Sequence, residues 1–237
     1  MTDTNAQIWK SEEVARSFAA MSSQREQERG EQLTLVARLL PLTGRTATVL
    51  DLGAGTGAAS RAVLKEHPGA TLFLAEYSPQ MAAEGRKQLG DYEGRYRYVE
   101  FDMLSSQWPA ELPAHVDAVV SALAIHHLPD DRKRSLFKEI RARLAPGGWF
   151  INYDPIKAPD ATMDEIWQRV NDLYDPSALY KRTHRTEQEQ LRYENHVRYM
   201  IPLAPQLEWL REAGFVDIDV FWKRLDWVIY GGRNPSA

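Results

Sequence analysis

From residue 47 onward, short apolar runs alternate with stretches of helical periodicity. The apolar runs predict strands over residues 48–52, 71–76, 96–101, 116–122 and 149–153. Apolar residues at helical spacing between them predict helices over residues 58–67, 80–89 and 131–144. Regular alternation of strand and helix indicates a parallel sheet with helices on both faces.

Two segments depart from this alternation. Residues 9–40 have helical periodicity and form an N-terminal helical arm, in which Gly30 is expected to separate two helices. Residues 155–200 are polar and aromatic, with helices predicted over 162–174 and 187–200 and no strand pattern. We therefore expect a single domain over all 237 residues, with a helical insertion at 155–200, here called the lid.

The C-terminal part ends in two strands. A helix over residues 204–213 is closed by Gly214, and strands are predicted over 216–221 and 226–230. The four residues between these strands are enough for an antiparallel hairpin and too few for a parallel crossover. The last two strands should therefore pair antiparallel.

Composition limits the classes of function. Hydrophobic residues make up 43% of the chain and charged residues 26%, as in globular domains. The net charge is −4, so no global basic field would attract nucleic acid, and no nucleic-acid partner is expected. The chain has no cysteine, which excludes disulfides, thiolate metal sites, iron–sulfur clusters and cysteine nucleophiles. No metal site is predicted from the sequence.

Two further absences bear on location. Residues 1–9 are polar and acidic, without the apolar core of a signal peptide. No run approaches the ~18 apolar residues of a membrane span. A cytoplasmic protein with no membrane partner is the expectation.

The glycine-rich segment at residues 49–57 carries the strongest chemical signal. A buried strand ends at Leu52, and Gly53, Gly55 and Gly57 allow a tight turn into the next helix. Such a turn lets a nucleotide-like ligand rest on backbone N–H groups at a helix N-terminus. The spacing also satisfies the dinucleotide fingerprint G-x-G-x-x-G/A, and a turn without any ligand is a third interpretation.

Two acidic residues at the ends of later strands help to decide which ligand the glycine turn binds. Glu76 ends the second strand and could accept hydrogen bonds from both ribose hydroxyls of an adenosine, in NAD or in S-adenosylmethionine. Asp102 follows the third strand and could accept from an adenine amino group, an acid that dinucleotide enzymes do not usually have. Met103 and Met81 could cover the two sides of the base, although a core methionine explains each equally well.

Five segments, taken in chain order, resemble motifs of the class I S-adenosylmethionine-dependent methyltransferases of the small-molecule type. They are residues 49–57 for motif I, 74–81 for the second-strand motif, 101–103 for the adenine position, 121–130 for the fourth-strand segment and 144–150 for the turn before the fifth strand. The resemblance is close over residues 47–154 and extends in pattern to the hairpin at 214–231.

This resemblance implies a fold and a cofactor. The fold would be a Rossmann-like, doubly wound α/β sheet of seven strands in the order 3-2-1-4-5-7-6, with strand seven antiparallel, in agreement with the C-terminal hairpin. The cofactor would be S-adenosylmethionine. The acceptor would be a small molecule, methylated on an oxygen or a nitrogen, and a homodimer is kept as a hypothesis.

The resemblance also assigns residues to parts of this cofactor. Asp51 and residues 53–55 would lie beside the methionine moiety, Glu76 would hold the ribose, Asp102 would hold the adenine, and the backbone at 121–122 would bind the amino group. The implied cofactor-binding residues are, in chain order, Asp51, Gly53, Ala54, Gly55, Glu76, Tyr77, Met81, Asp102, Met103, Ser121 and Ala122.

Candidate catalytic residues follow strands four and five, beyond which the acceptor should bind. His126 and His127 come after the fourth strand, and Tyr153 and Asp154 end the fifth. Methyl transfer needs a general base only where the acceptor must lose a proton. We take His126, His127 and Asp154 as catalytic candidates. At least one of the two histidines is expected to be structural, because the His-His-Leu-Pro run is common in this family.

The arm and the lid are expected to supply acceptor specificity. They hold aromatic residues interleaved with arginines, which suit a pocket for a small anionic or aromatic molecule. Residues 192, 193 and 196 can share one helical face, because they are spaced by three and four positions. The predicted acceptor-binding residues are Arg25, Tyr153, Arg192, Tyr193 and His196.

Three alternatives to a methyltransferase stay open at this stage. The glycine turn also suits an NAD-dependent oxidoreductase, and the fold also occurs in non-catalytic regulatory domains. In addition, residues 13–21 and 193–196 loosely resemble the carboxy-S-adenosylmethionine synthase branch, which makes a modified cofactor. That branch would need a charged anchor for the added carboxylate, and none can be assigned in the sequence.

Overall fold

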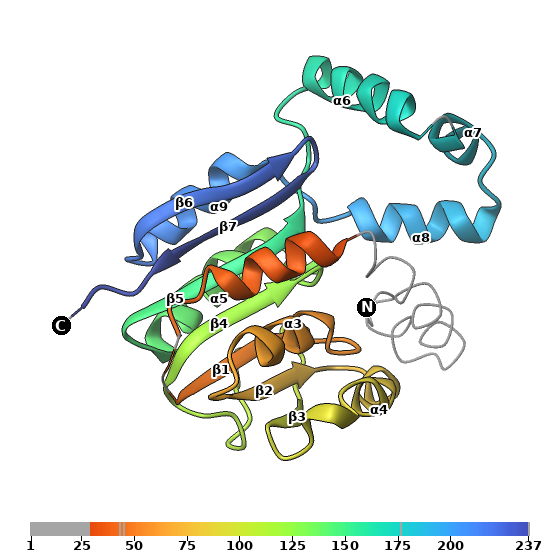
Figure 1. Cartoon of the computed structure of the whole chain (residues 1–237). Coiled ribbons are helices and arrows are strands. Elements are labelled where there is room, and N and C mark those ends of the chain that lie inside the picture. The colour runs from red at the N-terminus through yellow and green to blue at the C-terminus, as the bar shows by residue number, and fades with distance from the viewer. Residues whose placement is uncertain (1–28, 43, 45, 176, 237) are drawn as a thin grey trace.

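A seven-stranded sheet forms the centre of the protein, as a computed structural model shows for residues 29–42, 44, 46–175 and 177–236 (Figure 1). Its strands run in the order β3-β2-β1-β4-β5-β7-β6. β7 pairs antiparallel with β5 and with β6, and the other pairs are parallel. This confirms the predicted order and hairpin. The strands are β1 (Ala47–Leu52), β2 (Ala70–Glu76), β3 (Tyr96–Glu100), β4 (Val116–Ala122), β5 (Leu144–Pro155), β6 (Val216–Arg224) and β7 (Trp227–Arg233).

Helices connect and cover the strands, and a helix over residues 29–38 precedes β1. The labelled helices are α3 (Ala58–Glu66), α4 (Pro79–Gln88), α5 (Asp130–Arg143), α6 (Ala161–Tyr174), α7 (Ser177–Thr183), α8 (Glu187–Val197) and α9 (Leu203–Glu212), with 3-10 turns η1 (Gly90–Tyr92) and η2 (Ile125–His127). Gly30 lies in the first described turn of helix 29–38, and the rest of the predicted arm, Arg25 included, lies outside the described residues.

Two hydrophobic cores lie on opposite faces of the sheet, because successive residues of a strand point to opposite sides. Val49 of β1 belongs to the core under helix 29–38 and α3, where Val63 is also buried. Leu50 belongs to the opposite core, with Phe137 of α5 and Leu210 of α9. Figure 1 shows helix 29–38 and α3 in front of the sheet and α5 and α9 behind it.

The parallel register brings the carboxyl ends of the central strands to one edge. Leu52 of β1 lies beside Ser121 of β4, and Ala122 lies beside Tyr153 of β5. The connections leave β1 and β4 in opposite directions across the sheet, and a crevice forms at such a switch point. Every strand-end residue predicted for the cofactor or for catalysis therefore lies at or next to this edge.

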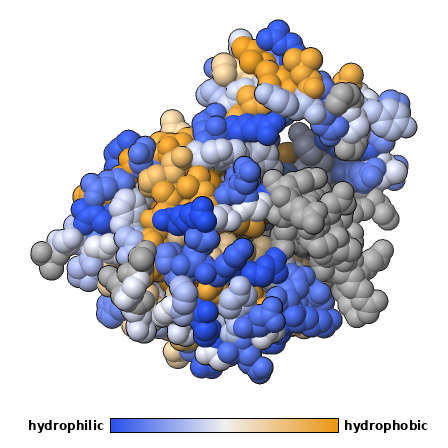
Figure 2. Space-filling model, in the orientation of Figure 1, coloured by the Kyte–Doolittle hydropathy of each residue, from blue (hydrophilic) through white to orange (hydrophobic). Residues whose placement is uncertain are grey.

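The lid extends away from the sheet as three helices (Figure 1). Asp160 caps the start of α6, and Thr186 and Glu189 form a capping box at the start of α8. α8 returns to the body, where it contacts η2. Large apolar side chains on the lid are exposed, including Leu173 at 78% and Tyr174 at 70%, and Figure 2 shows hydrophobic residues gathered on its outer end.

Two predicted boundaries are wrong, and one helix was not predicted. β5 begins at Leu144 rather than at residue 149, because Leu144 already pairs with Val116 and the Pro146–Gly148 segment forms an irregularity inside the strand. Helix α7 was not predicted from the sequence. α8 ends at Val197 rather than at residue 200.

The hairpin link is shorter than predicted, and the described helices agree with the prediction of no membrane span. The link between β6 and β7 is two residues, Leu225 and Asp226, shorter than the predicted four, and Leu225 has a φ of 51°. Among the described helices, none has the length and apolar character needed to cross a membrane.

Candidate active site

The glycine turn follows β1 and approaches its neighbours closely. Gly53 has a φ of 68°, and its N–H donates to the carbonyl of Ala75 at 2.9 Å, as does that of Ala54 at 3.2 Å. A Cβ on Gly53 would lie 2.3 Å from the Cβ of Ala124. Gly55 also has a positive φ, 54°. The turn thus needs glycine for both conformation and space, and it leaves backbone uncovered by side chains.

Asp51 lies directly beneath this turn and is 1% exposed. The hydroxyl of Ser60 donates to its Oδ2 at 2.6 Å, and its Oδ1 is buried without a hydrogen-bond partner among the described residues. Burial raises the pKa of Asp51 to about 7, against the bond from Ser60. An orphaned buried carboxylate oxygen of this kind is a site for a donor or a cation from a ligand.

Glu76 ends β2 and turns its carboxylate to the glycine turn. Its Oε2 accepts the N–H of Gly55 and its Oε1 accepts the N–H of Ser78, both at 2.7 Å. Burial raises the pKa of Glu76, and these N–H donors oppose the shift. Each carboxylate oxygen has a second lone pair, so the group can still accept from two ligand hydroxyls. Tyr77 follows and is half-buried.

Two methionine methyl groups lie against the same turn. The Cε of Met81 lies 3.4 Å from the position of a Cβ on Gly55, and the Cε of Met103 lies 3.0 Å from that on Gly53. Asp102 lies beside Met103, and its Oδ1 accepts the N–H of Leu104 at 2.9 Å. The structure therefore brings both methionines to the glycines, as an apolar base-binding site requires.

The end of β4 is held to the ends of its two neighbours. The hydroxyl of Ser121 donates to the carbonyl of Leu52 at 2.8 Å, while Ala122 is half-buried. Leu123 has a φ of 61°, and its N–H donates to the carbonyl of Tyr153 at 2.9 Å. A leucine in the left-handed region is strained, and such strain concentrates at functional sites.

After this strained residue, η2 places His126 against Asp154 of β5. Nδ1 of His126 lies 2.7 Å from Oδ1 of Asp154, and the backbone N–H of His126 donates to Oδ2 at 3.0 Å. His126 is 4% and Asp154 1% exposed. Burial lowers the pKa of His126 well below its usual range and raises that of Asp154 to about 7. The imidazole is then neutral at pH 7, with its Nδ1 held by the carboxylate.

A buried network fixes Asp154 from its other side. The amide of Asn152 donates to Asp154 Oδ2 at 3.2 Å and to the hydroxyl of Tyr230 at 3.0 Å. That hydroxyl donates in turn to Gln206 at 2.6 Å. Sequence reasoning missed these residues. The alternation of β5 was a usable signal for Asn152, which must share a face with Asp154.

Three histidines meet at this point, although only two are adjacent in sequence. Nε2 of His126 lies 3.3 Å from Nδ1 of His196 on α8, and the two rings are 4.8 Å apart in a T-shaped arrangement. The ring of His127 lies 3.9 Å from that of His126. Burial also lowers the pKa of His127 well below its usual range. Each of the three histidines is a predicted site residue, but no pattern in the sequence predicts that they cluster.

The other predicted acceptor residues are dispersed. Tyr153 is 2% exposed and packs near Trp222 and Trp227, and burial raises its pKa to about 12. Tyr193 is exposed, with Arg185 3.6 Å above its ring. Their contact with an acceptor stays a prediction, as does that of residues 25 and 192, whose side chains lie outside those described.

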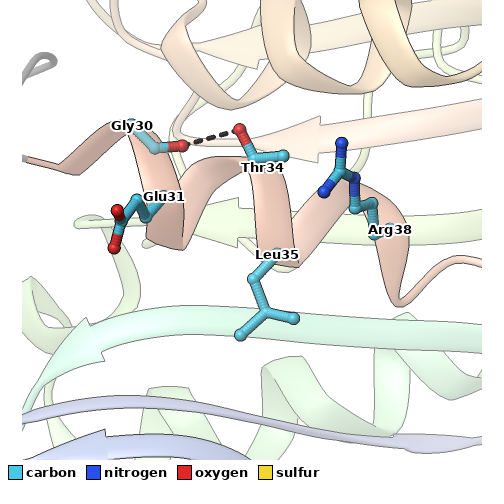
Figure 3. A pocket seen from close by; sticks show the side chains of 5 residues that line it. All are labelled: Gly30, Glu31, Thr34, Leu35 and Arg38. Atoms are coloured by element: carbon cyan, nitrogen blue, oxygen red, sulfur yellow. Dashed lines mark hydrogen bonds between the residues drawn. The ribbon is translucent and has the colours of Figure 1, made fainter.

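A charged residue of helix 29–38 was also missed. The guanidinium of Arg29 lies 4.7 Å from the ring centre of Trp227, and its charge acts on His126 and Tyr153. The same helix has a groove along one face, lined by Gly30, Glu31, Thr34, Leu35 and Arg38 (Figure 3). Since these five residues come from a single helix and include none of the strand-end groups, we do not assign the active site there.

Comparisons with known proteins agree with this geometry. A family described as "Methyltransferase domain" matches residues 50–150. The uncharacterized methyltransferase YrrT of Bacillus subtilis is 31% identical over 144 residues, which are 60% of this chain and 61% of that protein.

Solved methyltransferases share the fold. An O-methyltransferase family protein from Burkholderia thailandensis superimposes with a TM-score of 0.71 at 18% identity, covering 94% of this chain and 60% of that one. Human N-acetylserotonin methyltransferase, solved with SAM, gives a TM-score of 0.63 at 17% identity, covering 97% and 58%. The chain spans about three fifths of the length of each of these three proteins. The strand order and the solved neighbours show the fold of class I S-adenosylmethionine-dependent methyltransferases, and the methyltransferase-domain match covers the part of that fold that holds the glycine turn and its strand-end acids.

Proposed function

We propose that this protein transfers a methyl group from S-adenosylmethionine to an oxygen or a nitrogen of a small-molecule acceptor. The observation that carries the proposal is the buried pair of His126 and Asp154, with Nδ1 of the histidine 2.7 Å from the carboxylate. This pair lies at the same sheet edge as the glycine turn. A cofactor site and a base site thus adjoin each other, as a transfer reaction requires.

S-adenosylmethionine is the cofactor that the first site suits. The orphaned Oδ1 of Asp51 can receive positive charge, Glu76 can accept from two ribose hydroxyls, and Met81 and Met103 can cover a flat base. Two of the structural neighbours were solved with SAM or SAH, which supports the same choice over a nicotinamide dinucleotide. When bound, this cofactor supplies a methyl group on a sulfonium, an electrophile that needs no activation by the protein.

The residues of the chain then have two tasks. One is to align the acceptor and exclude water, which the returning lid helix α8 can do where it contacts η2. The other is to take the proton that an acceptor hydroxyl or ammonium must lose. Because Nδ1 of His126 is held by Asp154, its Nε2 is the atom that accepts this proton. His127, beside it, packs against the base.

Oxygen is the favoured acceptor atom. Solved neighbours described as O-methyltransferases, from Burkholderia thailandensis and Nostoc punctiforme, support this choice. A neutral hydroxyl also benefits more than a free amine from a neighbouring base, because it is a weak nucleophile until it loses its proton. A cytoplasmic location, the absence of a nucleic-acid partner, a homodimer and the carboxy-S-adenosylmethionine synthase alternative stay predictions.

Cofactor titration tests the first half of the proposal. Thermal-shift and calorimetric titrations should show stabilisation by S-adenosylmethionine and none by NAD. Binding should be lost in Asp51→Ala and Glu76→Arg, and kept in Glu84→Arg, which changes a half-buried residue of α4 paired with Lys87. Stabilisation by NAD alone, or unchanged binding in both site variants, would overturn the assignment.

The acceptor can be sought without knowing its identity. Protein incubated with a metabolite extract and methyl-labelled cofactor should yield a labelled product, identified by mass spectrometry. Tight cofactor binding with no labelled product across a broad acceptor panel would instead indicate a non-catalytic regulatory domain.

A further inference from the structure

Three histidines cluster beside the sheet edge, and the proposed transfer uses only one of them, His126, as its base. His126 and His127 come from η2, and His196 comes from the lid helix α8, 70 residues away from His126. One nitrogen from each ring can be chosen so that all three lie within 4.8 Å of one another. Among the described residues, these three side chains have the chemistry of metal ligands and are close enough together to bind one ion.

The spacing suits coordination of one ion. Two imidazole nitrogens bound tetrahedrally to the same Zn²⁺, each at about 2.0–2.1 Å, lie roughly 3.4 Å apart. Nε2 of His126 and Nδ1 of His196 are already 3.3 Å apart. The ring of His127 lies beside that of His126, with ring centres 3.9 Å apart, and one nitrogen of His127 lies within 4.8 Å of a nitrogen of each of the other two histidines.

The surroundings of His126 match those of a metal-binding histidine. Such ligands usually donate their second ring N–H to a carboxylate, which fixes the ring and its tautomer. Here Nδ1 of His126 lies 2.7 Å from Asp154, and Asn152 holds that carboxylate in turn. Nε2 is therefore directed at His196, and the orientation of this ligand does not depend on the ion.

We propose that His126, His127 and His196 bind one late first-row divalent metal ion, Zn²⁺ being the probe of choice. Neutral imidazoles suit Zn²⁺, Cu²⁺, Ni²⁺ and Fe²⁺, whereas Mg²⁺ and Ca²⁺ prefer oxygen ligands. Three protein ligands leave the fourth position of a tetrahedral ion open to water or another exogenous ligand.

A metal ion at this position would join the lid to the body of the protein. The end of α8 is already tied to the body there, because the buried Lys133 donates to the carbonyl of Tyr199. The ion would also occupy the lone pair of Nε2 that the proposed function assigns to the acceptor proton. The metal-loaded protein should therefore be unable to take that proton, a consequence that rests on the proposed function.

Metal binding can be measured independently of activity. Tag-free protein, freed of metal with a chelator, is titrated with Zn²⁺ by calorimetry, and the visible absorption of Co²⁺ reports its coordination geometry. We expect one equivalent to bind. His196→Ala should lower the affinity by at least the roughly 10- to 100-fold that the loss of outer-shell partners costs. His184→Ala removes an exposed lid histidine stacked on Tyr180 and should bind as the wild type does.

The outcomes separate the two proposals. Wild-type protein that binds no Zn²⁺, or His196→Ala protein that binds it as tightly, overturns the metal site. Circular dichroism of the His196→Ala variant shows whether it is folded, and the Asp154→Asn variant, which keeps all three ligands, should bind more weakly than wild type if the carboxylate orients His126. If Zn²⁺ binds as expected and the loaded enzyme still turns over at full rate, the metal site stands and the base assignment to His126 falls.

Discussion

The glycine-turn end of the sheet and the histidine end hold their polar groups in different ways. At the glycine turn, bonding partners are close in the chain: Ser60 binds Asp51 across 9 residues, and Gly55 binds Glu76 across 21. At the histidine end, His126 meets Asp154 across 28 residues and His196 across 70. One site is thus made within successive strand–turn–helix units, and the other exists only once the whole sheet and the lid have folded.

This difference teaches where specificity can change. The residues proposed for the cofactor lie at strand ends and on the short turns that follow them, so their positions follow from the strand ends. The residues proposed for the acceptor depend on η2, β5 and the lid, and α8 is the least buried of these. Substitutions in the lid can therefore alter the acceptor without disturbing the cofactor site.

The largest expected effect is a loss of kcat without a loss of cofactor affinity, caused by a substitution at the histidine end. His126→Asn should lower kcat by roughly 100- to 10,000-fold, the range that general-base catalysis supplies, because no other group holds Nε2 at this position. Calorimetry should show little change in S-adenosylmethionine affinity, since His126 belongs to the acceptor side. Steady-state kinetics with the identified acceptor measure the effect.

A second variant of the buried pair and a control variant on the lid complete this test. Asp154→Asn keeps the shape of the buried pair and should also lower kcat strongly, because it disturbs the tautomer of His126. His184→Asn changes an exposed lid histidine and should leave kcat near that of wild type. Wild-type kcat in both His126→Asn and Asp154→Asn would contradict the base assignment.

The second effect tests the geometry of the glycine turn. Gly53→Ala should lower the free energy of unfolding by about 2–5 kcal/mol, because its φ of 68° disfavours a side chain and its Cβ would overlap that of Ala124 at 2.3 Å. Gly44→Ala is the matched control. Gly44 has a similar φ of 73° with no atom within 4 Å of the new Cβ, so it should lose only about 1–2 kcal/mol. Urea denaturation measures both, and equal losses would show that the overlap is relieved without cost.

The same contrast explains what the sequence could predict. The hairpin and the positions of Asp51 and Glu76 at strand ends follow from the alternating elements, whereas the sheet order was implied by the resemblance to a family. The proximity of His126 to Asp154 could be predicted in part, because His126 follows β4, Asp154 ends β5, and the ends of these two strands share one edge of the sheet.

The rest depended on packing that no local pattern encodes. The position of His196 is set by how three lid helices return to the body, and nothing in the spacing of residues 192–196 indicates its neighbours 70 residues away. The bulged start of β5 depends on its pairing with Val116. Tyr230 reaches Asn152 across 78 residues and only through the antiparallel pairing of β7 with β5.

The smallest expected effect concerns pH and the cofactor side. In the free protein the pKa of Asp51 is raised to about 7 by burial, with the charge of Glu76 adding to the shift. A cationic methionine moiety beside Asp51 favours the ionised carboxylate, so below pH 7 binding must release a proton. Affinity for S-adenosylmethionine should therefore fall by up to about tenfold per pH unit as the pH drops from 7 to 6, and should not depend on this group above pH 8. Asp51→Asn protein should bind more weakly, with no such slope over the same range. Calorimetry in buffers of different ionisation enthalpy measures the released proton directly, and equal proton release by wild type and Asp51→Asn would assign it to another group.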